Sequence, residues 1–279
     1  MAVTPRYAGR LAPSPTGLLH LGHARTFWIA AQRARAANGF LWLRDEDLDP
    51  QRSRTDLAVA MREDLRWLGI TWDAEMRQSE RLGVYREAME KLVSAGSAYP
   101  CHCSRKDLQQ ALQAPHEDDD EPLYGGRCRP QATIAGAGLQ PGTNYRFRVP
   151  DGETVRFTDG SAGQQSFTTG CDLADFGDFV VWRKDGLPSY QLACVVDDAA
   201  MRITEVVRGR DLLRSTARQI LLQRALGLPT PLYFHTDLMR DRLGLRLAKR
   251  HDALSLSALR ESGYTPAQVL AKLNEDRPI

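Results

Sequence analysis

The chain lacks any apolar run that approaches the roughly 18 residues needed to span a membrane. Its N-terminus has no apolar core of the kind found in signal peptides, and no segment is repeated within the 279 residues. Cysteine is scarce: five residues, an odd number at uneven spacing, argue against a disulfide framework and favour free thiols or a metal site. We therefore expect a cytoplasmic protein.

A strong charge of either sign is also missing. The formal net charge is +2, and no basic tail indicates nucleic-acid binding, so an RNA contact would have to be a local basic patch. An acidic run at 116–121 is interpreted as a solvated loop. The length allows one large α/β domain, alone or with an insertion.

Strands and helices alternate along most of the chain, which is typical of a doubly wound parallel sheet. The apolar patterns predict strands at 7–12, 40–44, 179–183, 203–207 and 232–235, and helices at 21–38, 55–68, 79–95, 189–199 and 211–226. Between residues 99 and 178 this alternation is interrupted, and the segments 145–149 and 155–158 have the pattern of antiparallel strands. We predict a core formed by residues 1–98 and 179–279, with an inserted α+β subdomain at 99–178.

A turn rich in proline and glycine joins the first predicted strand to the first helix, in the segment RLAPSPTGLLHLGHAR at 10–25. A helix N-terminus favours phosphate, and Gly22 would let a phosphate or ribose approach the backbone. His20 and His23 would donate hydrogen bonds to an α-phosphate as it gains charge. The alternative is that His20 caps the helix and His23 is solvated. The segment favours a nucleotide site.

The longer motif resembles the signature of glutamyl-tRNA synthetases. Ala12-Pro13-Ser14-Pro15-Thr16-Gly17, followed by His20-Leu21-Gly22-His23, is similar to the HIGH motif of class I aminoacyl-tRNA synthetases in its glutamate-specific setting. The resemblance extends over nearly the whole chain and implies a Rossmann-like class I catalytic domain. The chain ends where a helical anticodon-binding region would begin, so we expect no anticodon-binding domain. A catalytic half of this kind resembles the glutamyl-Q tRNA(Asp) synthetases.

A pocket for glutamate has to bind two carboxylates and one ammonium group, for which arginine and an acidic side chain are suited. The resemblance places eight residues around the substrate glutamate: Arg10, Leu11, Ala12, Pro13, Ser14, Glu46, Tyr190 and Arg208. We assign Arg10, Tyr190 and Arg208 to the carboxylates. Glu46, with Ser14, is assigned to the ammonium group. Each residue also has an ordinary structural alternative, but all follow strands or turns at the carboxyl edge of the predicted sheet, where such folds bind ligands.

Class I synthetases carry a second ATP-binding element, the KMSKS loop, after a late strand. The matching segment here is Gly244-Leu-Arg-Leu-Ala-Lys-Arg250, which keeps the second lysine as Lys249 and has Arg246 and Ala248 in place of the first lysine and the serine. The alternative is a basic surface loop. We expect ATP contacts from five residues: His20, Gly22, His23, Arg246 and Lys249. His20, His23 and Lys249 are the predicted catalytic residues, because cationic and donor groups stabilise the transition state.

The predicted insertion contains Cys101-His102-Cys103, followed by Tyr124 and Cys128. Such thiolates can surround a tetrahedral zinc, and chemistry alone would take His102 or His116 as the fourth ligand. The resemblance instead implies Tyr124, because the glutamyl-Q enzymes pair CxC with YxxxC. We therefore predict one structural zinc bound by Cys101, Cys103, Tyr124 and Cys128. The alternative is three ordinary, partly buried cysteines.

The resemblance implies a two-step reaction. Glutamate is activated by ATP with Mg²⁺ to glutamyl-adenylate without tRNA, and the acyl group passes to the queuosine base in the anticodon of tRNA(Asp). Three alternatives remain: a truncated glutamyl-tRNA synthetase that charges the 3′ end of tRNA(Glu), a small-molecule nucleotidylyltransferase, and a non-catalytic tRNA-binding paralog. We expect a monomer whose partners are L-glutamate, ATP and tRNA(Asp) carrying queuosine.

Overall fold

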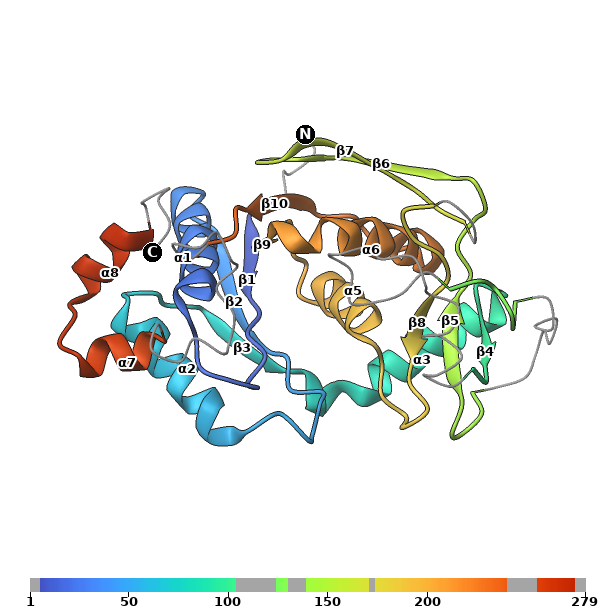
Figure 1. Cartoon of the computed structure of the whole chain (residues 1–279), viewed down its shortest axis with the longest axis horizontal. Helices are drawn as coiled ribbons and strands as arrows, with labels where there is room; N and C mark the ends of the chain where they lie inside the picture. The colour runs from blue at the N-terminus through green and yellow to red at the C-terminus, as the bar shows by residue number, and fades with distance from the viewer. Residues whose placement is uncertain (1–5, 104–123, 130–138, 171–173, 240–254, 274–279) are drawn as a thin grey trace. The chain divides into compact units, whose positions relative to one another are not determined.

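The computed structural model describes residues 6–103, 124–129, 139–170, 174–239 and 255–273 (Figure 1). The chain divides into two compact units. The first comprises Met1–Glu80, Met201–Arg210 and Pro231–Ile279, and the second comprises Arg81–Ala200 and Asp211–Thr230. This division does not test the predicted limits of the insertion, which stay a prediction.

The first unit is built on parallel strands: β1 (Ala8–Leu11), β2 (Phe40–Asp45), β3 (Ala74–Arg77), β9 (Glu205–Gly209) and β10 (Leu232–Thr236). Strand β2 pairs in parallel with both β1 and β3, and β10 pairs in parallel with β9. The backbone N–H of Thr204 donates to the carbonyl of Ala8 at 2.9 Å, so β9 lies beside β1. This arrangement confirms the predicted α/β class with a parallel sheet.

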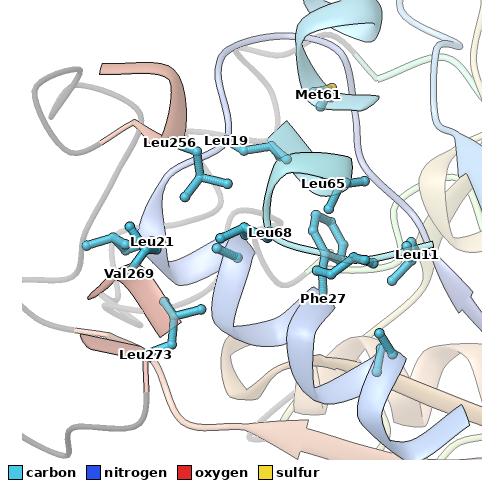
Figure 2. Close-up of a cluster of buried hydrophobic side chains, with 14 of the residues drawn as sticks. Leu11, Leu19, Leu21, Phe27, Met61, Leu65, Leu68, Leu256, Val269 and Leu273 are labelled. Atoms are coloured by element: carbon cyan, nitrogen blue, oxygen red, sulfur yellow. The ribbon is translucent and has the colours of Figure 1, made fainter. Parts of the chain in front are cut away.

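Four helices of the first unit surround a hydrophobic cluster: α1 (Leu21–Ala36), α2 (Thr55–Trp67), α7 (Leu256–Glu261) and α8 (Pro266–Leu273). Figure 2 shows some of its buried side chains, among them Leu11 of β1 and, from the four helices, Phe27, Leu65, Leu256 and Leu273. Burial of each such side chain contributes about 1.5 to 3 kcal/mol to folding. The cluster therefore gives firm support to the end of β1 and to the start of α1.

The second unit combines helices with antiparallel strands. Helices α3 (Leu82–Ser94), α5 (Tyr190–Ala200) and α6 (Leu213–Leu226) pack on one another. A three-stranded sheet has the order β4-β5-β8, with β4 at Ala98–Cys101, β5 at Asn144–Phe147 and β8 at Phe179–Trp182. After β5 in the chain, β6 (Thr154–Asp159) and β7 (Gly163–Thr168) form an antiparallel hairpin.

The structure differs from the sequence-based expectation at β8. The alternation of the parallel core was expected to resume there, but β8 pairs antiparallel with β5. The reason is local packing, since Phe179 lies opposite Phe147 across the two strands with ring centroids 5.4 Å apart. An apolar run of this length does not by itself determine the direction in which a strand pairs.

None of the helices in the described part of the chain combines the length and the apolar character that crossing a membrane requires.

Candidate functional site

The HIGH-like motif lies at the start of α1. His20 is the N-cap residue, and its Nδ1 accepts a hydrogen bond from the backbone N–H of Gly22 at 3.1 Å. A Cβ at position 22 would lie only 3.0 Å from Cε1 of His20, so glycine lets the imidazole fold over the helix end. The capping alternative for His20 is therefore observed. A neutral ring that accepts at Nδ1 carries its proton on Nε2, which is the kind of donor that a phosphate contact needs.

His23 lies one turn into the same helix, against His20. The two imidazole rings are stacked, with centroids 3.8 Å apart and an interplanar angle of 26°. The structure thus brings together both predicted histidines at a helix N-terminus, where backbone N–H groups and the helix dipole attract anions. Their predicted roles toward ATP are taken up under the proposed function.

The proline-rich turn after β1 is tied to the chain after β2. The backbone N–H of Glu46 donates to the carbonyl of Pro13, and that of Arg54 donates to the carbonyl of Pro15, each at 3.0 Å. Within the turn, the N–H of Thr16 donates to the carbonyl of Ser14 at 2.7 Å. These bonds hold the turn at the carboxyl ends of β1 and β2, where open α/β sheets bind ligands.

Two arginines predicted to bind carboxylates lie in neighbouring strands of the first unit. Arg10 in β1 and Arg208 in β9 are 4% and 5% exposed. Arg10 donates from Nη1 to the carbonyl of Val207 at 3.0 Å, so it reaches across to the residue before Arg208. A guanidinium group is a planar fork of donors that matches a carboxylate, so this pair provides anion-binding chemistry at the predicted place.

Glu46 and Ser14, the pair assigned to the ammonium group, also lie together. Ser14 Oγ donates to Glu46 Oε2 at 3.5 Å, and the fully buried Arg44 donates from Nη2 to Glu46 Oε1 at 3.1 Å. Arg44 was not predicted as part of the site. Its hydrogen bond fixes the position of the Glu46 carboxyl group beside Ser14.

The remaining predicted glutamate residues have different surroundings. Leu11 is fully buried in the hydrophobic cluster, so only its backbone is suited to contact a polar ligand. Tyr190 begins α5 in the second unit and is 39% exposed. Arg246 and Lys249, predicted to contact ATP, lie outside the described residues.

His235 was missed by sequence reasoning. It is fully buried in β10, opposite Arg208 in the register of the two strands, and its Nε2 accepts a hydrogen bond from Arg208 Nε at 3.3 Å. Thr236, the next residue, shares a hydrogen bond with Thr26 of α1 at 2.9 Å between their hydroxyl oxygens. The only signal in the sequence was that His235 ends the predicted strand 232–235 at the carboxyl edge and Thr236 directly follows it.

The second site is a cluster of cysteines in the second unit. The Sγ atoms of Cys101, Cys103 and Cys128 all lie within 4.8 Å of one another, and Cys103 and Cys128 are 3.4 Å apart. Tyr124 joins them, with Oη 3.8 Å from Cys101 Sγ and 3.7 Å from Cys103 Sγ. Four ligands around a tetrahedral zinc with Zn–S bonds of about 2.3 Å have their sulfur atoms roughly 3.8 Å apart. The cluster can therefore hold a metal of that geometry.

Burial changes the ionisation of the side chains in the cluster, raising the pKa of Cys103 and Tyr124. Burial raises the pKa of Cys103 to about 11, against the lowering effect of its hydrogen bond with Tyr124. Burial also raises the pKa of Tyr124, and the backbone N–H of Cys128 donates to its Oη at 2.8 Å. A metal ion offsets the cost of ionising such groups, because thiolate and phenolate are the forms that bind it. His102 is exposed and is not part of the cluster, and His116 lies outside the described residues.

Comparison with known proteins assigns the chain to a family. Residues 7–275 match the family described as tRNA synthetases class I (E and Q), catalytic domain. The chain belongs to this family and is a ligase of the class I aminoacyl-tRNA synthetase type.

Two relatives share a more particular name. The chain is 47% identical to the glutamyl-Q tRNA(Asp) synthetase of Symbiobacterium thermophilum, with 95% of this chain and 84% of that protein covered. It is 43% identical to the glutamyl-Q tRNA(Asp) synthetase of Rhodobacter capsulatus, with 93% and 97% covered. These matches confirm the resemblance to that group.

Glutamate–tRNA ligases match over a smaller share of their own length. The ligase of Aquifex aeolicus is 43% identical over 92% of this chain, which is 54% of that protein. A second match is the crystal structure of a glutamate tRNA ligase from Elizabethkingia meningosepticum in complex with its amino acid. The two structures superpose with a TM-score of 0.75 at 28% sequence identity. The match covers 93% of this chain and 54% of that chain. The chain thus spans about half the length of these ligases.

Proposed function

We propose that the protein activates L-glutamate with ATP and transfers it to the queuosine base in the anticodon of tRNA(Asp). In the first step, an oxygen of the glutamate α-carboxylate attacks the α-phosphorus of ATP. The bond to the bridging oxygen breaks, so that glutamyl-adenylate forms and pyrophosphate leaves. In the second step, a hydroxyl of queuosine attacks the acyl carbon, releases AMP and gives up its proton.

The observation that supports the first step is that the groups we assign to glutamate lie at or just after the carboxyl ends of strands of the first unit. Arg10 and Arg208 supply forks for carboxylates, and Glu46 beside Ser14 supplies an acceptor for the ammonium group. These groups occupy the carboxyl ends of strands in the unit that also holds the HIGH-like turn. An amino acid with two carboxylates fits this set of charges better than one with an apolar side chain.

The ATP-binding part of the proposal rests on the HIGH-like turn and on the sequence of the KMSKS-like segment. His20 and His23 would donate to the α-phosphate, with Gly22 giving backbone access. Arg246 and Lys249 would neutralise the charge of the departing pyrophosphate, together with Mg²⁺. The acceptor, queuosine in tRNA(Asp), is proposed because of the names of the relatives that the chain covers most completely.

We also propose that Cys101, Cys103, Cys128 and Tyr124 bind one zinc ion. The close approach of three sulfur atoms and one phenolic oxygen supports this set. All four positions are filled by protein atoms, and such closed sites are structural, so the ion would stabilise the fold without taking part in the reaction.

Glutamate-dependent exchange between ATP and pyrophosphate, measured without tRNA, tests the activation step. We expect exchange with glutamate and little with aspartate or glutamine. Arg208→Gln should lower kcat/KM for glutamate by about 100-fold or more, because a bidentate pair between charges is lost. The matched control is Arg210→Gln, since Arg210 is a more exposed arginine that pairs with Asp237 at 2.8 Å.

Lys249→Ala should lower the exchange rate with less effect on the KM for glutamate, because its charge acts on the phosphates. Exchange that appears only when tRNA(Glu) is added would contradict tRNA-independent activation and favour the charging enzyme. No exchange under any condition would favour the tRNA-binding paralog.

The acceptor is tested with tRNA(Asp) that carries either queuosine or guanine in the anticodon, each with and without its 3′-terminal adenosine. We expect glutamate to be transferred only to the queuosine form, and equally well without the terminal adenosine. Transfer that depends on the terminal adenosine would show charging of the 3′ end and would overturn this part of the proposal.

A further inference from the structure

Arg146 lies against the cysteine cluster from the strand next to Cys101. It belongs to β5, which pairs antiparallel with β4, and only 2% of its surface is exposed. Its Nε donates a hydrogen bond to Cys101 Sγ at 3.4 Å, and its guanidinium carbon lies 4.0 Å from the centre of the Tyr124 ring. A single side chain therefore touches two of the four proposed zinc ligands.

The other end of the guanidinium is also fixed. Nη1 of Arg146 donates to the backbone carbonyl of Asp178 at 2.8 Å. The carboxylate of Asp178 in turn accepts from the hydroxyl of Tyr99 at 2.5 Å and from the backbone N–H of Val149 at 2.8 Å. Arg146 is thus also held by a buried network around Asp178.

We propose that Arg146 is a positioning residue of the zinc site, which retains the metal by acting on Cys101 and Tyr124. This proposal rests on the proposed zinc site and goes beyond its ligand set. The hydrogen bond from Arg146 occupies one lone pair of the Cys101 sulfur and leaves the other lone pairs for the metal. The stacking contact fixes the ring of Tyr124, so that its oxygen stays next to the sulfur atoms.

Charge gives a second reason for an arginine at this position. Three thiolates outweigh the two positive charges of Zn²⁺, so the loaded site is anionic before any contribution from Tyr124. A buried anionic site is costly unless a cation lies beside it. A planar guanidinium can donate to sulfur along its edge and stack on an aromatic ring with its face, whereas the ammonium group of lysine cannot do both.

Arg148 offers a matched control, because it lies two residues further along the same segment. Its guanidinium carbon is 5.1 Å from the centre of the Tyr99 ring, and Nη2 donates to the carbonyl of Arg129 at 2.9 Å. The two arginines therefore share a stacking contact and a bond to a backbone carbonyl. They differ in that Arg146 is buried and contacts zinc ligands, whereas Arg148 is partly exposed and contacts none of the four.

The test compares the whole protein, purified with zinc, with the variants Arg146→Met, Arg146→Lys and Arg148→Met. The zinc content is measured first, and then the rate of zinc release to a coloured chelator. We expect Arg146→Met to release zinc about 10- to 100-fold faster, since loss of a residue that orients metal ligands typically costs that much in affinity. Arg146→Lys should recover only part of the loss, and Arg148→Met should behave as the parent protein does.

Substitution of Co²⁺ for zinc adds a spectroscopic measurement that does not depend on activity. The visible absorption of Co²⁺ reports the geometry of its ligands, and we expect it to change in Arg146→Met and to stay unchanged in Arg148→Met. Equal release rates and equal spectra in the parent protein and in both Arg146 variants would overturn the role of Arg146. Absence of zinc from the parent protein would instead overturn the proposed zinc site, and this inference with it. If Arg146→Met does not fold, the comparison of Arg146→Lys with Arg148→Met decides.

Discussion

Arg208 is held by the neighbouring strand before any ligand arrives. Its Nε donates to Nε2 of His235 at 3.3 Å, which requires the buried imidazole to be neutral and to carry its proton on Nδ1. Tyr233, two residues earlier in β10, lies below the guanidinium at 5.6 Å from ring centre to guanidinium carbon. His235 therefore limits the directions in which the remaining donors of Arg208 can point.

Replacement of His235 by phenylalanine should raise the KM for glutamate in the exchange reaction. Phenylalanine keeps an aromatic ring at this position but cannot accept the hydrogen bond from the charged Arg208. A hydrogen bond to a charged group contributes about 1.5 to 3 kcal/mol, which corresponds to roughly tenfold or more in affinity. His235→Gln, which keeps an acceptor, should recover part of the effect, and the KM for ATP should not change. The control is Tyr233→Phe, which keeps the ring face under Arg208. An equal rise in KM for this control would show that the effect is not specific to the hydrogen bond between His235 and Arg208.

Motifs with a fixed local spacing were accessible from the sequence, whereas contacts across strands were not. The three cysteines were predicted as a group, and the structure brings their sulfur atoms together. By contrast, the contacts of Arg208 with His235 and of Arg146 with Cys101 join residues that are 27 and 45 positions apart. The register of strand pairing decides such contacts, and it follows from the packing of whole strands.

At the level of elements, α7 connects the C-terminal part of the first unit to the HIGH-like turn. The backbone N–H of Leu256 donates to the carbonyl of Leu19 at 2.8 Å, and Ser255 forms a bridge with His20. Helix α7 also contacts α2, where Arg260 lies 3.4 Å from the fully buried carboxylate of Asp64. The segment with Arg246 and Lys249 directly precedes α7 in the sequence.

The stability of this docking should depend on pH through Asp64. Burial raises the pKa of Asp64 to about 6, although Arg260 acts to lower it, and Glu63 and Glu261 raise it further. In the unfolded chain its pKa is near 3.9. The folded state therefore binds the proton more tightly, and the stabilising contribution is present below about pH 4 and is lost as the pH rises through about 6.

Asp64→Asn should remove this dependence, because the amide stays neutral at every pH. We expect the melting temperature of the variant, relative to the parent protein, to rise as the pH increases from about 4 to about 7. Thermal unfolding followed by circular dichroism at several pH values measures this difference. Glu63→Gln, at an exposed neighbour of Arg260, should show no comparable trend. A constant difference between Asp64→Asn and the parent protein would show that Asp64 ionises normally.

Among the elements that sequence patterns missed are two short and polar strands. Strands β3, with the sequence AEMR, and β7, with GQQSFT, carry few apolar residues and lie at the ends of their strand orders. An edge strand buries little, so its formation depends on the neighbour to which it hydrogen-bonds and leaves no pattern of its own. The helices that the apolar spacing predicted at 21–38 and 55–68 are present as α1 and α2, because each buries one face in the hydrophobic cluster.

At the scale of the whole molecule, neither compact unit is a continuous piece of the chain. In the sequence, strand β9 of the first unit lies between the two segments of the second unit, and strand β10 follows the later of them. Arg10 and Arg208, both assigned to the glutamate carboxylates, therefore come from distant segments: Arg10 bonds to the carbonyl of Val207, the residue before Arg208, across 197 positions. Experiments on this site and on the metal cluster accordingly use the full chain, since neither unit corresponds to one continuous segment.

Removal of zinc should destabilise the full chain by loss of a ligand that binds only the folded state. A ligand present at 100 times its dissociation constant stabilises a protein by about 2.7 kcal/mol. At about 2 to 4 °C per kcal/mol for a protein of this size, chelation should lower the melting temperature by roughly 5 to 10 °C. Added zinc should restore it.

Two cysteine variants make this measurement specific to the cluster. Cys128→Ser should have a lower melting temperature that no longer responds to the chelator, because one of the proposed ligands is lost. Cys194→Ala is the control, since Cys194 is buried in α5 and is not one of the clustered cysteines. It should keep the full response to chelation, even if loss of its sulfur lowers stability. A chelator response that survives in Cys128→Ser would place the metal elsewhere, because an ion bound by this cluster cannot stabilise the fold through a ligand that has been removed.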